Sequence, residues 1–85
     1  MTTINYKIGD KTGEIVWSAS EAFEELRNRT YDLGKMEAVE IEKLDFLSLR
    51  AKILLSAVAG AIIQHLLDQG CEAEEIFELG KFEVE

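Results

Sequence analysis

An uncharged run of fifteen residues, ILLSAVAGAIIQHLL at positions 53–67, constrains the fold of this chain more than any other feature. Charged residues, Lys52 and Asp68, flank it on both sides. The run is shorter than the roughly 20 apolar residues that cross the hydrocarbon core of a bilayer, and Gln64 and His65 interrupt it. We therefore expect no membrane partner, and we interpret the run as part of a helix that packs within a folded domain.

The run belongs to a long helix that the sequence predicts over residues 46–69. Asp45 can serve as its N-cap, Gly70 can end it, and the chain contains no proline that would interrupt it. When the helix is projected at about 100° per residue, its large apolar side chains fall on one side. These are Leu54, Leu55, Val58, Ile62, Ile63 and Leu66. We expect this side to face the core, with Leu54 among its least replaceable positions.

Small side chains occupy the opposite side of this helix, and they include Ala57, Ala61 and Gln64. Two interpretations stay open. Small residues are tolerated where a helix faces water or packs closely within its own domain, and they also let a second helix approach. Ala57, Ala61 and Gln64 are therefore candidate residues for a homodimer contact.

Residues 3–18 predict an N-terminal β-hairpin. Apolar residues alternate with polar ones over residues 3–8, and the later EIVW is rich in residues that favour strands. In the connecting GDKTGE, Asp10 can open a type I turn, and Gly13 can adopt the left-handed conformation that closes it with a bulge.

Four further elements follow from local patterns. They are a helix at 19–33, a strand at 38–44, a short helix at 72–79 and an edge strand at 81–85. The helix at 19–33 begins with the capping-box pair Ser18 and Glu21 and ends before Gly34. The strand at 38–44 rests on the alternation of Val39 and Ile41 with glutamates.

Together these elements predict a single domain over residues 1–85 with an α+β fold in two layers. In this fold the N-terminal hairpin and one or two further short strands pack on two helices. The alternative is a mostly helical fold in which residues 35–69 form one continuous helix. The single cysteine, Cys71, excludes an intrachain disulfide, and no secretory signal is visible. We therefore expect a cytoplasmic protein.

The net charge of −8 argues against direct binding to nucleic acid, because that binding depends on lysine and arginine at phosphates. The acidity is concentrated in residues 37–45 and 72–85. A negative surface can attract a basic protein partner, and it can also serve only to keep a small protein soluble. The candidate partner-binding residues are Glu72, Glu74, Glu75, Glu78 and Glu83.

His65, Asp68 and Cys71 are spaced three residues apart, and this spacing suggests a metal site or a base with an orienting carboxylate. Zinc sites normally need four ligands, so such a site would require a second subunit. A histidine at the edge of the core and a buried thiol explain the same residues. We expect no catalytic residue, cofactor or metal ligand, and we keep a composite site near His65 as an alternative.

The leading functional hypothesis is a small acidic, non-enzymatic protein-interaction module of bacterial or phage type. It would act as a regulator or inhibitor by binding a partner protein. One alternative is an immunity or anti-defence protein, or a nucleic-acid mimic, that blocks a basic nucleic-acid-binding target. Another is a homo-oligomeric accessory protein, or a small enzyme with a composite site.

Overall fold

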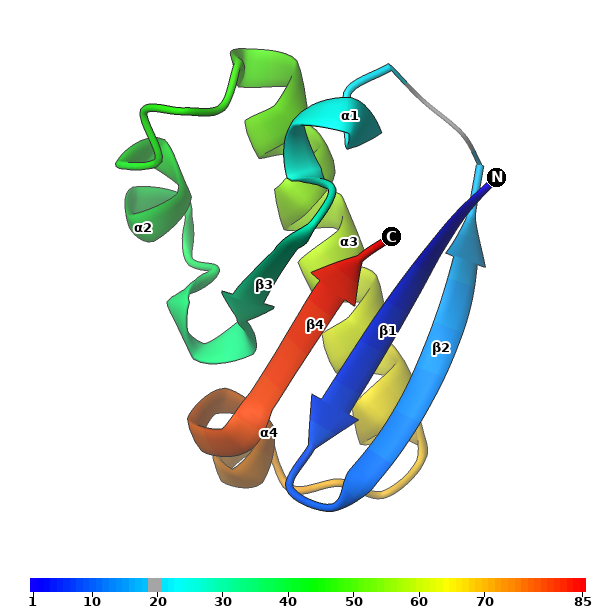
Figure 1. Cartoon of the computed structure of the whole chain (residues 1–85). Helices are drawn as coiled ribbons and strands as arrows, with labels where there is room; N and C mark the ends of the chain where they lie inside the picture. Colours follow the sequence, from blue (N-terminus) through cyan, green and yellow to red (C-terminus); the bar gives the residue numbers. More distant parts are fainter. Residues whose placement is uncertain (19–20) are drawn as a thin grey trace.

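A computed structural model describes residues 1–18 and 21–85 of the chain. In these residues four antiparallel strands form one sheet, and the two main helices pack against one of its faces (Figure 1). The predicted α+β class with an N-terminal hairpin is therefore confirmed. The mostly helical alternative is wrong, because two strands beyond the hairpin join the sheet.

The order of the strands in the sheet is β2, β1, β4, β3. Their bounds are Thr2–Ile8 for β1, Lys11–Trp17 for β2, Arg29–Asp32 for β3 and Gly80–Val84 for β4. β4 pairs with β1 on one side and with β3 on the other. The strand predicted at 81–85 is therefore central, whereas the sequence placed it at the edge of the sheet. Its alternate residues Phe82 and Val84 are buried in the core.

The hairpin turn is tighter than predicted. Ile8 pairs directly with Lys11, so that Gly9 and Asp10 alone connect the strands. Gly9 has a φ of +56°, and a positive φ at the first of two loop residues is typical of a type II′ turn. Gly13 is not part of the turn but lies within β2 opposite Tyr6, whose ring fills the space that a Cβ atom at position 13 would need.

The helix predicted at 19–33 is wrong over most of its length. A single turn, α1 (Phe23–Leu26), is followed by the strand β3. The N-cap of α1 is Ala22, so the predicted capping box does not form, and residues 19–20 lie outside the described residues. Arg27 is already extended and ends the helical path, and Asn28 follows it with a φ of 62°. Pairing with β4 then draws residues 29–32 into the sheet.

The strand predicted at 38–44 is also wrong. A 3₁₀ turn, η1 (Leu33–Lys35), leads into a short helix, α2 (Ala38–Glu42). In α2 only Ile41 reaches the core, whereas Val39 is 60% exposed, so the segment lacks the shared buried face that a strand would require. Gly34 lies within η1 because a Cβ atom there would collide with the carbonyl oxygen of Phe77.

The predicted long helix corresponds to α3 (Leu49–Asp68), which is followed by Gly70 with a φ of +90°. Its N-cap is Ser48, and Asp45 lies outside the helix. The Ser48 Oγ atom accepts a hydrogen bond from the Ala51 N–H at 3.3 Å. Glu25 of α1 completes the cap, because its carboxylate accepts hydrogen bonds from the Ser48 N–H at 2.8 Å and the Ser48 hydroxyl at 2.6 Å.

The core-facing side of α3 is rotated slightly from the predicted side. Its buried residues are Ala51, Leu55, Val58, Ala59, Ile62 and Leu66. Leu54 and Ile63 are only partly buried and flank this set. The prediction that Leu54 is among the least replaceable positions is therefore wrong, because the helix presents Leu55 to the core in its place. The short helix α4 (Ala73–Leu79) follows, with Ile76 buried, and leads into β4.

Leu55 and Leu54 allow a matched test of this orientation. Leu55→Ala should lower the free energy of unfolding by about 2–5 kcal/mol, because it opens a cavity at a fully buried position. Leu54→Ala makes the same chemical change on the same helix and should cost roughly half as much or less, since part of its side chain already contacts water. Urea denaturation of both variants measures the difference. Equal losses would contradict the orientation of α3.

The contact between Glu25 and Ser48 predicts a pH dependence. The hydrogen bonds from the Ser48 hydroxyl and N–H lower the pKa of Glu25. A lowered pKa in the folded state gives stability that is present above the unfolded pKa of about 4.3 and is lost as the pH falls through the folded pKa.

Glu25→Gln should therefore be less stable than the wild type near neutral pH, and this difference should shrink as the pH falls below about 4. Ser48→Ala, which removes one of the two donors, should reduce the pH-dependent part of the difference. Denaturation of the three proteins between pH 3 and pH 7 checks both statements. A difference that is constant over this range would show that the contact does not affect the titration of Glu25.

Candidate functional site

Two extended surfaces of the molecule are candidate sites. The first is the open face of the sheet, which faces the viewer in Figure 1 and which no described helix covers. The second is formed by the outer sides of the helices. The two surfaces differ in charge and in their apolar content, and these differences decide what each can bind.

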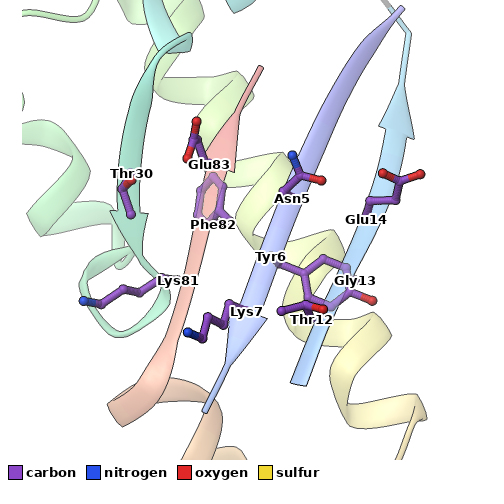
Figure 2. A pocket seen from close by; sticks show the side chains of 10 residues that line it. All are labelled: Asn5, Tyr6, Lys7, Thr12, Gly13, Glu14, Thr30, Lys81, Phe82 and Glu83. Atoms are coloured by element: carbon purple, nitrogen blue, oxygen red, sulfur yellow. The ribbon is translucent and has the colours of Figure 1, made fainter. Parts of the chain in front are cut away.

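The open face of the sheet carries polar side chains in rows across the strands, and they surround a shallow hollow of about 550 Å³ (Figure 2). Lys7 and Lys81 lie directly opposite each other in one row. In the next row Glu83 lies between Asn5 and Thr30. The residues that line the hollow are Asn5, Tyr6, Lys7, Thr12, Gly13, Glu14, Thr30, Lys81, Phe82 and Glu83.

The hollow has no net charge, because two lysines are balanced by Glu14 and Glu83. Its polar side chains project into solvent from successive strands (Figure 2). Such groups form hydrogen bonds with water as readily as with a ligand, so the open face carries no strong preference for one chemistry.

The outer surface of α2 and α4, which we call the acidic helical surface, is strongly negative. Both helices lie on the same side of the molecule (Figure 1), and Glu37 and Phe77 line the same groove beside η1. Seven carboxylates belong to these two helices or their N-caps, namely Glu37, Glu40 and Glu42 for α2 and Glu72, Glu74, Glu75 and Glu78 for α4. Glu37 lines the groove with Phe77, whereas Glu40 and Glu42 line separate hollows that also contain Arg29 and Lys52, respectively.

Few of these carboxylates are neutralised within the chain. Glu40 lies 3.8 Å from the Lys43 ammonium, and in the described residues the other six form no ion pair. Each of the two helices also exposes a large apolar side chain, Val39 of α2 at 60% and Phe77 of α4 at 50%. The acidic helical surface thus combines unpaired negative charge with apolar side chains that no described part of the chain covers.

The structure divides the predicted set of partner-binding glutamates. Glu72, Glu74, Glu75 and Glu78 come together on α4 and its N-cap, whereas Glu83 lies on the open face of the sheet. Sequence reasoning missed Val39, which it placed in a half-buried strand, and Phe77, which it did not single out. The apolar residues Ile76, Phe77 and Leu79 of the EIFEL segment gave a weak signal, because a helix of two turns cannot bury all three of them.

His65, Asp68 and Cys71 do not form a common site. His65 is exposed, contacts the edge of the Tyr6 ring and is hydrogen-bonded to Gln69 at 3.0 Å. Asp68 accepts a hydrogen bond from Gln64, and Cys71 is a buried free thiol. Burial, together with the nearby thiol, raises the pKa of Tyr6. Within residues 1–18 and 21–85 no group of three or more His, Cys, Asp or Glu residues could hold a metal ion.

The outer face of α3 contains the candidate dimer residues. Ala57 and Gln64 are exposed and Ala61 is partly buried, so the small side of the helix is accessible in a single chain. By length and composition alone α3 could also cross a membrane, a property it shares with the core helices of many soluble proteins. Its buried face packs in the core formed with the sheet, and insertion into a bilayer would require that packing to be broken.

No family model matches this sequence, and no curated protein or solved structure is significantly similar to it. Functional inference therefore rests on the surfaces described above.

Proposed function

We propose that this protein is a non-enzymatic interaction module that binds a basic partner protein through the acidic helical surface. It would act as a regulator or inhibitor by covering the partner's own functional surface. The observation that supports this proposal is the set of six carboxylates without an ion pair, within the described residues, on the two helices that also expose Val39 and Phe77.

The combination of charges and apolar side chains suits protein recognition better than either alone. Complementary charges guide the approach of two proteins and can raise association rates from about 10⁵–10⁶ to 10⁸–10⁹ M⁻¹s⁻¹ at low salt. Apolar and especially aromatic anchors near the centre of an interface supply most of the affinity, and a polar rim surrounds them. Phe77 can serve as such an anchor, with the glutamates of α2 and α4 as its rim.

The position of this surface supports binding without a large change in structure. Ile76 anchors α4 in the core, and the backbone of Phe77 packs closely against Gly34 of η1. The glutamates of α4 therefore lie on a helix whose inner side is packed against the rest of the domain. A partner would meet a preformed surface, which lowers the cost of ordering on binding.

A matched pair of charge variants tests the proposal. Glu74→Gln with Glu78→Gln removes two charges from α4, and Glu14→Gln with Glu83→Gln removes two charges from the open face of the sheet. The partner is first isolated by affinity purification with the wild-type protein and identified by mass spectrometry. Its dissociation constants for the three proteins are then measured by calorimetry at two salt concentrations.

The α4 variant should bind at least tenfold more weakly, which corresponds to about 1.4 kcal/mol, and its affinity should depend less on salt. The sheet variant has the same net charge and should bind within about threefold of the wild type, roughly 0.7 kcal/mol. Phe77→Ala should weaken binding without changing the salt dependence. Equal losses in the two charge variants would show that net charge, and not this surface, governs binding.

A further inference from the structure

We propose that a second copy of this chain docks on the outer face of α3, with the two α3 helices antiparallel and in closest contact at Ser56 and Gly60. This contact borders the acidic helical surface, because Ser56, Gly60 and Ile63 line the same groove as Glu37 and Phe77. A second copy and a basic partner would therefore compete for this groove, and the two contacts should depend on salt in opposite directions.

A row of six positions along α3 carries the argument, and we call it the α3 stripe. It consists of Leu49, Ile53, Ser56, Gly60, Ile63 and Leu67. These positions are separated alternately by four and three residues, which is the spacing of the contact positions in a two-helix coiled coil. Three of its four large side chains are exposed, Leu49 at 74%, Ile53 at 64% and Leu67 at 40%, whereas Ile63 is partly buried beside the core.

The order of side chains in the α3 stripe matches a two-fold axis. Read from either end it gives leucine, isoleucine, then a small residue, about a centre at position 58. In a symmetric dimer, residue i of one copy contacts residue j of the other and j contacts i. An antiparallel pairing therefore places Leu49 on Leu67 of the second copy and Ile53 on Ile63 of the second copy. Large side chains then meet large ones at both ends of the contact.

The middle of the α3 stripe allows the two backbones to approach. Ser56 faces Gly60 of the second copy in this register, and Ala57, beside them, is also small and exposed. A Cβ atom added at Gly60 would meet no described atom within 4 Å, so packing inside the chain does not require a glycine there. Glycine is unfavourable in the interior of a helix, and a close helix contact gives a physical reason for it.

Charge complementarity favours the antiparallel arrangement. The α3 stripe itself is uncharged, while Arg50 and Lys52 lie near the start of α3 and Asp68 lies at its end. Glu37 and Glu42, from the N-cap and the end of α2, border the stripe on one side, so the complementary charges are those on its other side. An antiparallel pair brings Arg50 toward Gln64 and Asp68 of the second copy, whereas a parallel pair would bring like charges together. The net charge of −8 on each chain opposes association, but exposed charges are largely screened beyond about 8 Å at physiological salt.

The size of the contact predicts a moderate affinity. The α3 stripe runs over 19 residues, from Leu49 to Leu67, or about 27 Å of helix. One helix pair of this length buries less than the roughly 800 Å² per partner of a stable complex. We therefore expect a dissociation constant in the micromolar range that falls as the salt concentration rises. A contact between the acidic helical surface and a basic partner should instead weaken with salt.

The test is the mass in solution, measured by sedimentation velocity and light scattering from 1 μM to 1 mM protein. The wild type should change from monomer to dimer over this range. Gly60→Gln should weaken the dimer at least tenfold, because a long side chain holds the helices apart, while its monomer should be as stable as the wild type or more so. Ala73→Gln adds a similar side chain at an exposed position on α4 and should dimerise like the wild type.

Cysteine variants test the register. Ser56→Cys and Gly60→Cys should not form crosslinks when each is oxidised alone, but an equimolar mixture should give a covalent dimer, with the wild type and its buried Cys71 as the background control. Crosslinking of each variant alone would overturn the antiparallel arrangement. The proposal as a whole is overturned by a wild type that stays monomeric at 1 mM, by an unchanged dimer in Gly60→Gln, or by a monomer that binds phosphatidylcholine vesicles through α3.

Discussion

The pairing of β4 with both β1 and β3 is the contact on which the rest of the structure depends. The last strand of the chain connects the N-terminal hairpin to residues 29–32, which have no other strand beside them in the described sheet. Phe82 stacks on Tyr31 with 5.2 Å between ring centroids, and Val84 accepts a hydrogen bond from Asn28 at 2.9 Å. The inner face on which α3 packs is complete only when these pairings have formed.

The N-terminal hairpin and α3 could be predicted from the sequence because the residues that define each of them are close together in the chain. The N-terminal hairpin shows alternating apolar residues, and α3 combines a long apolar period with Gly70 at its end. Residues 29–32 could not be predicted in this way, because helical spacing continues through Thr30 and Leu33 while the pairing that overrides it comes from β4, some fifty residues later. The prediction of the α3 N-cap was wrong for the same reason, because Glu25, which binds Ser48, lies 23 residues earlier in the chain.

Only part of the candidate surfaces could be predicted from the sequence. The glutamates of α4 are adjacent in sequence, so their common surface follows from any helix at 72–79. The exposure of Val39 and the separation of Glu83 depend on the path of the chain between η1 and β4, and no local pattern encodes that path. A helical projection likewise separates large from small residues on α3. The projection does not show which flank of the helix the neighbouring elements cover. For this reason the prediction placed Leu54 among the core positions that matter most, whereas the structure buries Leu55 fully and Leu54 only in part.

The acidic helical surface and the α3 stripe share a groove, because Ser56, Gly60 and Ile63 of the stripe line it together with Glu37 and Phe77. Self-association brings two chains of charge −8 together, and this repulsion is part of the free energy of the dimer. A basic partner bound over Phe77 would occupy the groove that a second copy needs, so the two binding events oppose each other. Because coupling between two binding events is reciprocal, dimerisation would weaken binding of the partner by the same factor. High salt would then favour the dimer, and low salt would favour the complex with the basic partner.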